Sequence, residues 1–203
     1  MGELLMRRRE MTMAGDSPQS DLIYELETPM SFDGTNGVDT GVALIGNYSD
    51  GTASPFTILF DGTPSNVSGD KYLFAGRSAS LGKVMVNASL YNSGNLYTGW
   101  FANTNGNTGN SFGAGKIVRV AVTFSPETGA VYKWSVNGSS VKRKTYSTTP
   151  AGAIIAETDT IKIGMSATSS TSGRFKGVIN AFNIYRRKFT DDEISDFLAN
   201  GIS

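Results

Sequence analysis

The stretch that decides the fold is KIVRVAVTFSPETGAVYKWSVNG, residues 116–138. Apolar side chains recur at every second position of its first half, at Val118, Val120, Val122 and Phe124. This period of two is typical of a β-strand with one face on a core and the other partly wet. The segment 126–129 then favours a turn, and Asn137-Gly138 is a type I′ hairpin signal. We therefore predict a three-stranded antiparallel meander from Lys116 to about Tyr146.

The remainder of the chain shows the same style of pattern. Short apolar or alternating runs are separated by Gly, Pro, Asn and Ser at intervals of about 8 to 15 residues, the spacing of a sandwich or barrel. Outside the meander, the predicted strands are Leu22–Glu27, Val42–Gly46, Phe56–Phe60, Tyr72–Gly76, Lys83–Tyr91, Leu96–Ala102, Thr160–Ser166 and Arg174–Arg186. In the last of these, both alternating sets carry apolar residues, so we expect cover on both faces.

One helix is predicted, in KFTDDEISDFLANGIS at residues 188–203. Thr190 and Glu193 have the spacing of a capping box, and Gly201 suits the C-terminal end. A short helix that lies against the sandwich is expected, with its buried face made by Ile194, Phe197 and Leu198.

Composition narrows the function classes. The 203 residues include 18 Lys+Arg, 18 Asp+Glu, no His and no Cys. The zero net charge favours neither nucleic acid nor an anionic membrane as a partner. The absence of His and Cys excludes thiol nucleophiles, His-based triads and disulfides. No apolar run approaches the roughly 18 to 20 residues of a membrane span. We expect one domain, at residues 21–203.

Residues 1–20 precede that domain as an extended arm or linker. The sequence MGELLMRRREMTMAGDSP carries three arginines and three acidic residues within positions 1–16, so it lacks the charge of a nucleic-acid arm. Acidic and small polar residues interrupt it too early for a secretory signal. Two interpretations stay open: an unstructured leader, or a docking arm whose contacts are made by Met6, Arg7, Arg8, Arg9 and Met11.

Three stretches together resemble one family. They are MSFDGTNGVDTGVAL (30–44), VRVAVTFSPETGAVYKWSVNG (118–138) and GRFKGVINAFNIYRRKFTDDEISDFLANG (173–201). In order and spacing they are similar to the laminin G-like branch of the concanavalin A-like jelly rolls. The resemblance implies an all-β fold of two curved antiparallel sheets, with a ligand or interface surface on the concave side or the loop rim.

Members of that superfamily that cut glycans use carboxylates at alternating positions of a strand, because two carboxyl groups must flank the scissile bond. No such pair is evident. Asp191, Asp192 and Glu193 are explained by helix capping, and Glu157 with Asp159 flanks a turn. We predict that the protein is not an enzyme and needs no cofactor.

Calcium is the one ion that the loops suggest. Asp33, Asp61, Asn66 and Asp70 offer hard oxygen ligands, although without EF-hand spacing. The alternative is ordinary Asx-turn chemistry, so no metal site is predicted and a structural calcium stays open.

A sugar-binding surface needs aromatic rings beside amide side chains. In LYTGWFANTNGNTGNSFGAG, residues 96–115, Tyr97 and Trp100 precede a polar loop that contains Asn103 and Asn105. These four residues are the predicted glycan site. The alternative is that Trp100 and Trp134 belong to the core and the loop is a solvated connection.

The arm also resembles leaders of structural proteins from gut tailed phages and prophages. The leading hypothesis is a non-catalytic virion surface protein, such as a head or tail decoration or fibre component, assembled in the host cytoplasm without a signal peptide. It would dock on other virion proteins through the arm, form a homo-oligomer and present the lectin-like domain, including to surface polysaccharide. The competing hypothesis is a stand-alone carbohydrate-binding module.

Overall fold

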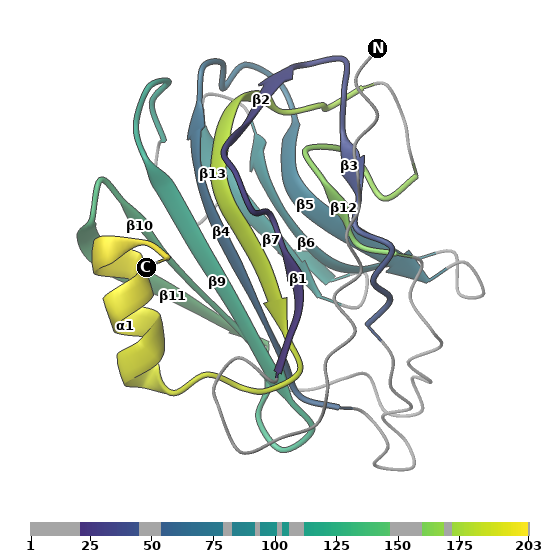
Figure 1. The fold of residues 1–203 in the computed structure, drawn as a ribbon, viewed down its shortest axis with the longest axis vertical. Helices are drawn as coiled ribbons and strands as arrows, with labels where there is room; N and C mark the ends of the chain where they lie inside the picture. Colours follow the sequence, from purple (N-terminus) through teal and green to yellow (C-terminus); the bar gives the residue numbers. More distant parts are fainter. Residues whose placement is uncertain are drawn as a thin grey trace.

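The computed structural model describes residues 21–44, 54–78, 83–91, 94–100, 103–105, 112–146, 160–168 and 172–202. In this part of the chain, two antiparallel sheets face each other and one helix, α1 (Asp191–Asn200), lies outside them (Figure 1). The predicted all-β, two-sheet jelly-roll sandwich with a short helix near the C-terminus is therefore confirmed.

Sheet A has seven strands, in the order β1-β13-β4-β9-β10-β11, with β2 paired to β13. Their bounds are β1 (Leu22–Glu25), β2 (Met30–Asp33), β4 (Phe56–Pro64), β9 (Val118–Ser125), β10 (Gly129–Val136), β11 (Ser139–Tyr146) and β13 (Lys176–Tyr185). Sheet B has six strands, in the order β3-β12-β5-β6-β7-β8. Their bounds are β3 (Val38–Asp39), β5 (Lys71–Ser78), β6 (Lys83–Tyr91), β7 (Asn95–Trp100), β8 (Asn103–Asn105) and β12 (Lys162–Ile163).

The predicted meander is present as β9, β10 and β11. The two residues of its second turn, Asn137 and Gly138, have positive φ angles of 50° and 69°, as a type I′ turn requires. The four alternating apolar residues of β9 are all at most 1% exposed and face sheet B. The other face of β9 is more buried than predicted, because Ala121 packs against α1 and is also 1% exposed.

Aromatic side chains from both sheets fill the space between them. The ring of Phe74 in sheet B lies 6.4 Å from that of Phe60 and 5.7 Å from that of Phe182, both in sheet A. Phe60 is in turn 6.1 Å from Phe175, which precedes β13. Tyr132 donates a hydrogen bond of 2.6 Å to the carbonyl of Gly99, and so joins β10 to β7. Burial of such rings is the main stabilising contribution to a sandwich core.

Four strand predictions need correction. Of the predicted strand Thr160–Ser166, only β12 (Lys162–Ile163) is in a strand. Residues 42–44 of the predicted strand Val42–Gly46 are not in a strand, although the Val42 carbonyl accepts a hydrogen bond of 2.8 Å from Ile161. β4 continues beyond Phe60 to Pro64, because its pairing with β9 extends to Gly62 and its pairing with β13 to Pro64. β8 occupies positions that were predicted as a loop.

The closing strand, β13, contains a bulge that the alternation did not reveal. The register shifts between Ile179 and Ala181. As a result Ile179, Phe182 and Ile184 all reach the core and are 0% exposed, although they belong to different alternating sets in the sequence. The outer face is only partly covered, since Val178 is 36% exposed.

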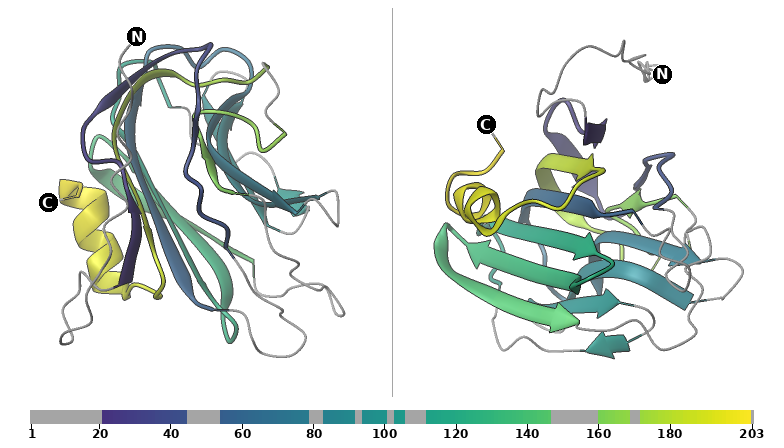
Figure 2. Two further views of the ribbon diagram at one scale, coloured as in Figure 1. Left: turned by 45° about the vertical axis from the view of Figure 1, so that its right-hand side comes forward. Right: turned by 90° about the horizontal axis from the view of Figure 1, so that it is seen from below.

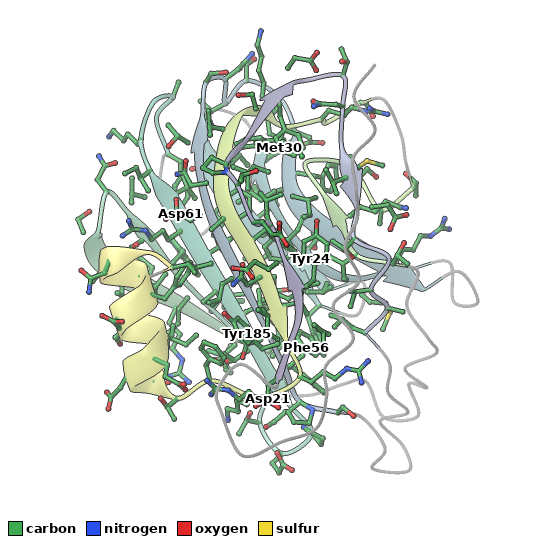
Figure 3. All side chains as sticks on the ribbon, viewed as in Figure 1. Asp21, Tyr24, Met30, Phe56, Asp61 and Tyr185 are labelled. Carbon is green, nitrogen blue, oxygen red and sulfur yellow. The ribbon has the colours of Figure 1, made fainter. Side chains whose placement is uncertain are left out.

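The helix has the predicted capping box. Thr190 Oγ1 accepts a hydrogen bond of 3.2 Å from the Glu193 amide, and the Glu193 carboxylate accepts one of 2.7 Å from the Thr190 amide. Arg187 binds the same carboxylate through both terminal nitrogens, and its Nε lies 3.5 Å from the carboxylate of Asp21. Asp21, which directly precedes β1, is labelled in Figure 3. The hydrogen bonds to the Glu193 carboxylate lower the pKa of Glu193 to about 2, the bonds from Arg187 being the largest cause.

Arg119 of β9 fastens the other end of α1 to sheet A. Its Nη1 donates hydrogen bonds of 2.6 Å and 3.2 Å to the carbonyls of Ala199 and Leu198, which have no partner within the helix. Its Nε is 2.8 Å from the carboxylate of Asp61, labelled in Figure 3, which also accepts a hydrogen bond from Asn180 at the β13 bulge. The side chains of Arg119 and Asp61 are only 12% and 8% exposed.

We predict that Arg119→Met lowers the free energy of unfolding by about 3 to 5 kcal/mol, because it leaves the buried Asp61 carboxylate without a cation. Urea denaturation of the purified protein measures this change. Lys133→Met is the matched control, since Lys133 pairs with Asp191, whose side chain is 79% exposed. Its loss should stay below about 1 kcal/mol. Equal losses for the two variants would contradict the assignment of Arg119 as the fastening residue.

Candidate functional site

The outer faces of the two sheets differ in what lies on them. On sheet A, Ile194, Phe197 and Leu198 of α1 pack against Leu59 and Ala121. Figure 2 shows the helix on this side of the sandwich, away from sheet B. Sheet A therefore uses part of its outer face for intramolecular packing. The outer face of sheet B is the broad face on which to look for a ligand site.

Three tyrosines come together on that outer face, one from each of β5, β6 and β7. Tyr72 lies opposite Ser89, and Ser89 lies opposite Tyr97. Tyr91 follows Ser89 by two residues and so shares its face. Its ring is 4.9 Å from that of Tyr97 in an edge-to-face contact. We call Tyr72, Ser89, Tyr91 and Tyr97 the tyrosine face.

The accessibility of these side chains suits contact with a ligand. All three tyrosines are half-buried, so each ring is held in place while part of it reaches solvent. Ser89 lies between two of them and is 7% exposed. Burial and, to a smaller extent, the nearby Asp70 raise the pKa of Tyr72. Its hydroxyl therefore stays protonated at neutral pH and can donate a hydrogen bond.

Asn87 extends the tyrosine face by one row. It precedes Ser89 by two residues, lies opposite Gly99 and is 6% exposed. A Cβ atom at Gly99 would be 1.9 Å from Asn87 Oδ1, so the glycine is what makes room for the amide. Ala75, on the other side of Asn87, is also small. Ala75 is 0% exposed and Gly99 is also buried, so this row is a covered continuation of the outer face beside the rings, with an amide at its centre.

The four residues of the predicted glycan site do not form one patch. Tyr97 lies on the tyrosine face, and its part in glycan binding stays a prediction. Trp100 lies on the opposite face of β7 because it is three positions after Tyr97, an odd number. It is 3% exposed, with its ring 4.9 Å from that of Phe124. The prediction that Trp100 is an exposed ring on which a sugar stacks is therefore wrong. The alternative, that Trp100 and Trp134 are core residues, is correct, and Trp134 is 2% exposed.

Asn103 and Asn105 lie in β8, opposite Trp100 and Thr98 respectively. The residue opposite Gly99 is Thr104. The register thus aligns the two asparagines with the buried positions of β7 and not with the row that contains Asn87 and Gly99. The residues of the predicted docking arm, Met6, Arg7, Arg8, Arg9 and Met11, are outside the described part of the chain.

Sequence reasoning missed Tyr72 and Tyr91. Each belongs to a predicted strand, but their proximity to Tyr97 depends on how three strands are paired. A usable signal was the position of the tyrosines, since Tyr72 begins one predicted strand and Tyr91 ends the next along the chain. In an antiparallel pair these two ends meet.

Three of the four suggested calcium ligands, Asp33, Asn66 and Asp61, have protein partners of their own. Asp33 Oδ1 accepts hydrogen bonds from the amides of Thr35 and Asn36 and from the Thr35 hydroxyl, as in an Asx turn. These bonds lower the pKa of Asp33. Asn66 likewise accepts from the Ser68 amide. Asp61 was expected in a loop, but it lies in the strand β4 and binds Arg119. Among the described residues no group of three or more acidic side chains is placed to hold a metal ion.

Potential catalytic carboxylates have similar explanations. Asp191 binds Lys133 at 2.8 Å, and Glu193 completes the capping box. Glu157 and Asp159 are outside the described residues. Asp39 is the one acidic residue in the sheet B strands as bounded above, and Lys162 binds it at 2.7 Å.

Among the described residues, no helix has the length and apolar character of a membrane crossing.

The fold and the sequence define the class of protein. A family model described as the concanavalin A-like lectin/glucanases superfamily, of the laminin G type, matches residues 33–195. The chain belongs to this superfamily. No curated protein matches the sequence.

Solved structures share the fold at low sequence identity. A heptameric SAP-like pentraxin from Limulus polyphemus is 17% identical, with a TM-score of 0.63 over 90% of this chain and 84% of that one. A mutant of Trypanosoma rangeli sialidase displaying trans-sialidase activity is 16% identical, with a TM-score of 0.64 over 88% of this chain and 28% of that one. The NanB sialidase of Streptococcus pneumoniae, as a K499G mutant, is 15% identical, with a TM-score of 0.60 over 89% and 29%. The chain spans under a third of each sialidase, and these similarities concern the fold alone.

We predict that Gly99→Ala lowers the free energy of unfolding by about 1 to 3 kcal/mol, because the new methyl group overlaps Asn87 Oδ1. Combining it with Asn87→Ala should recover part of this loss, which a double-mutant cycle in urea detects. Gly113→Ala is the control, since its Cβ would be no closer than 3.3 Å to the flexible end of Lys116. Strict additivity of the two substitutions would contradict the proposed contact.

Proposed function

We propose that this chain is a non-catalytic carbohydrate-binding domain that holds a glycan on the tyrosine face. The observation that carries the proposal is the convergence of Tyr72, Tyr91 and Tyr97 from three adjacent strands around Ser89. The lectin-type superfamily is consistent with it.

The chemistry of the tyrosine face fits a sugar. Pyranose rings present apolar C–H faces that pack on aromatic rings, and hydroxyl groups at their edges that form hydrogen bonds. The tyrosine rings supply the first kind of contact. The hydroxyls of Ser89 and Tyr72 supply the second, since a hydroxyl both donates and accepts.

Binding without hydrolysis is the simpler interpretation of the carboxylates. Glycoside hydrolysis ordinarily uses two carboxyl groups on either side of the scissile bond. In the strands of sheet B the available carboxylate is Asp39, which Lys162 already binds. This chain matches less than a third of each sialidase chain, so the activity of the whole sialidases is no argument for catalysis here.

We predict that Tyr97→Ala and Tyr72→Ala each weaken glycan binding by about tenfold, which corresponds to about 1.4 kcal/mol. A glycan array with the whole chain identifies the ligand, and calorimetry then measures the dissociation constants. Tyr185→Ala is the matched control, because Tyr185 is a half-buried tyrosine on sheet A. It should leave the affinity unchanged.

Two results would contradict the proposal. One is an array on which no glycan binds, and the other is an equal loss of affinity in all three variants. Trp100→Ala is unsuitable as a binding test, because removal of a buried tryptophan destabilises the fold by about 3 to 5 kcal/mol.

We further propose that the domain is displayed on a virion, with residues 1–20 as the tether and other virion proteins as its partners. The sequence of the arm supports this proposal through its resemblance to phage and prophage leaders. A homo-oligomeric arrangement belongs to the same proposal, and the fold occurs in an assembly of that kind in the heptameric pentraxin.

Deletion of residues 1–20 should abolish incorporation into particles without changing glycan affinity, because the arm and the tyrosine face are separate parts of the chain. Co-expression with the other virion proteins, followed by gradient sedimentation, measures incorporation. A chain in which Arg7, Arg8 and Arg9 are replaced by Ser serves as a milder variant. Unchanged incorporation of the deletion would contradict the tether and favour the stand-alone carbohydrate-binding module.

A further inference from the structure

One edge of sheet A ends in an exposed strand. β11 is the last strand in the order of the sheet and pairs with β10 alone among the described strands. Val141 is 48% exposed, and Lys142, Arg143 and Thr145 are exposed beside it. An edge strand presents a row of unpaired N–H and C=O groups along its free side. β11 is eight residues long, which is enough for a second chain to pair with it.

The charges along this edge are all of one sign. The β10–β11 segment, residues 129–146, contains four cations and no acidic residue, although the whole chain is neutral. Lys133 is neutralised by Asp191. The ion pairs among the described residues involve Arg119, Lys133, Lys162 and Arg187, and none involves the three cations of β11. Arg143 is close enough to α1 for its charge to contribute, after that of Lys133, to lowering the pKa of Asp191, whereas Lys142 and Lys144 have no acidic partner in the described part of the chain.

The three cations of β11 lie on both faces of the sheet. Lys142 and Lys144 are opposite the buried residues Trp134 and Tyr132, so they belong to the inner side. The ammonium group of Lys144 lies 5.6 Å from the ring of Tyr146. Arg143 is opposite Lys133 on the outer side, and its Nε donates a hydrogen bond of 3.3 Å to Thr145.

This alternation limits the shape of a partner. A polymer that lies flat on one face of the sheet reaches one set of cations only. A chain added as a further strand has side chains on both faces and hydrogen-bonding groups on its edge, so it reaches all three cations and the free backbone together. A second copy of β11 would place lysines and arginines against each other and is disfavoured.

We propose that β11 is a docking edge for an extended acidic peptide segment of another protein, which adds to sheet A as a strand. Backbone hydrogen bonds give the register, and carboxylates on successive residues bind Arg143 on one face and Lys142 and Lys144 on the other. This site is separate from the tyrosine face. The two can be occupied together, and the failure of one proposal leaves the other standing.

The test uses the whole chain and a nine-residue capped peptide with three consecutive glutamates between Thr and Val residues. Fluorescence anisotropy at low salt should show saturable binding, and hydrogen exchange should show added protection in β11. The same peptide with alternate backbone amides N-methylated should bind at least tenfold more weakly. Reversal of Lys142, Arg143 and Lys144 to Glu should lower affinity at least tenfold and create affinity for a peptide with three lysines in place of the glutamates.

The control variant reverses Lys176 and Arg186, two exposed cations in and directly after β13, which is separated from β11 by three strands of sheet A, and should bind like the unmodified protein. Three outcomes would overturn the proposal: no binding, equal binding of the N-methylated peptide, or an equal loss in the control variant. If no peptide binds, the cations of β11 are explained as charges that keep an edge strand from aggregating. Equal binding of the N-methylated peptide, or an equal loss in the control variant, would indicate that the peptide is attracted by charge alone and does not add to the sheet as a strand. Because the peptide comparison uses the unmodified chain, it stands even if the triple variant does not fold.

Discussion

Every strand of a sandwich can give its core only every second side chain, and this constraint decides what each residue of the protein can do. In β7 it sends Trp100 into the core and Tyr97 to the outer face, although the two residues are close neighbours in sequence. In β6 it gives Ala88 and Leu90 to the core and leaves Asn87, Ser89 and Tyr91 outside. The tyrosine face exists because β6 and β7 keep the same alternation in register, and because an irregularity between Tyr72 and Phe74 in β5 puts Tyr72 opposite Ser89 while Leu73 and Phe74 both enter the core.

The bulge in β13 is one of the places where the alternation is broken, and it has a structural use. The extra residue, Asn180, allows Ile179 and Phe182 to enter the same core. Its amide binds Asp61, which binds Arg119, which in turn binds the last carbonyls of α1. A local irregularity is thereby joined to the docking of the helix on sheet A. The helix takes up part of that outer face, and the ligand site is proposed on the other sheet.

The neutral net charge of the chain conceals an uneven distribution. Most of the strongest ion pairs fasten elements together, such as Arg187 with Glu193 at the start of α1. The cations of β11 form none among the described residues and stand on an open edge. A neutral, partly aromatic face and a cationic edge suit different kinds of partner. In the two proposals the glycan lies on the tyrosine face and the acidic peptide on β11, so the two ligands would occupy separate places.

Features that depend on neighbours in sequence could be predicted from the sequence. The meander around Asn137-Gly138 and the capping box of Thr190 and Glu193 were such features, because turn and cap preferences act over a few residues. The resemblance of three stretches to a known family was sufficient for the two-sheet architecture. Pairing between distant strands is not encoded locally. Only the tertiary structure could bring Tyr72 and Tyr91 to Tyr97, move Asp61 from a loop into β4, and place the cations of β11 on a free edge.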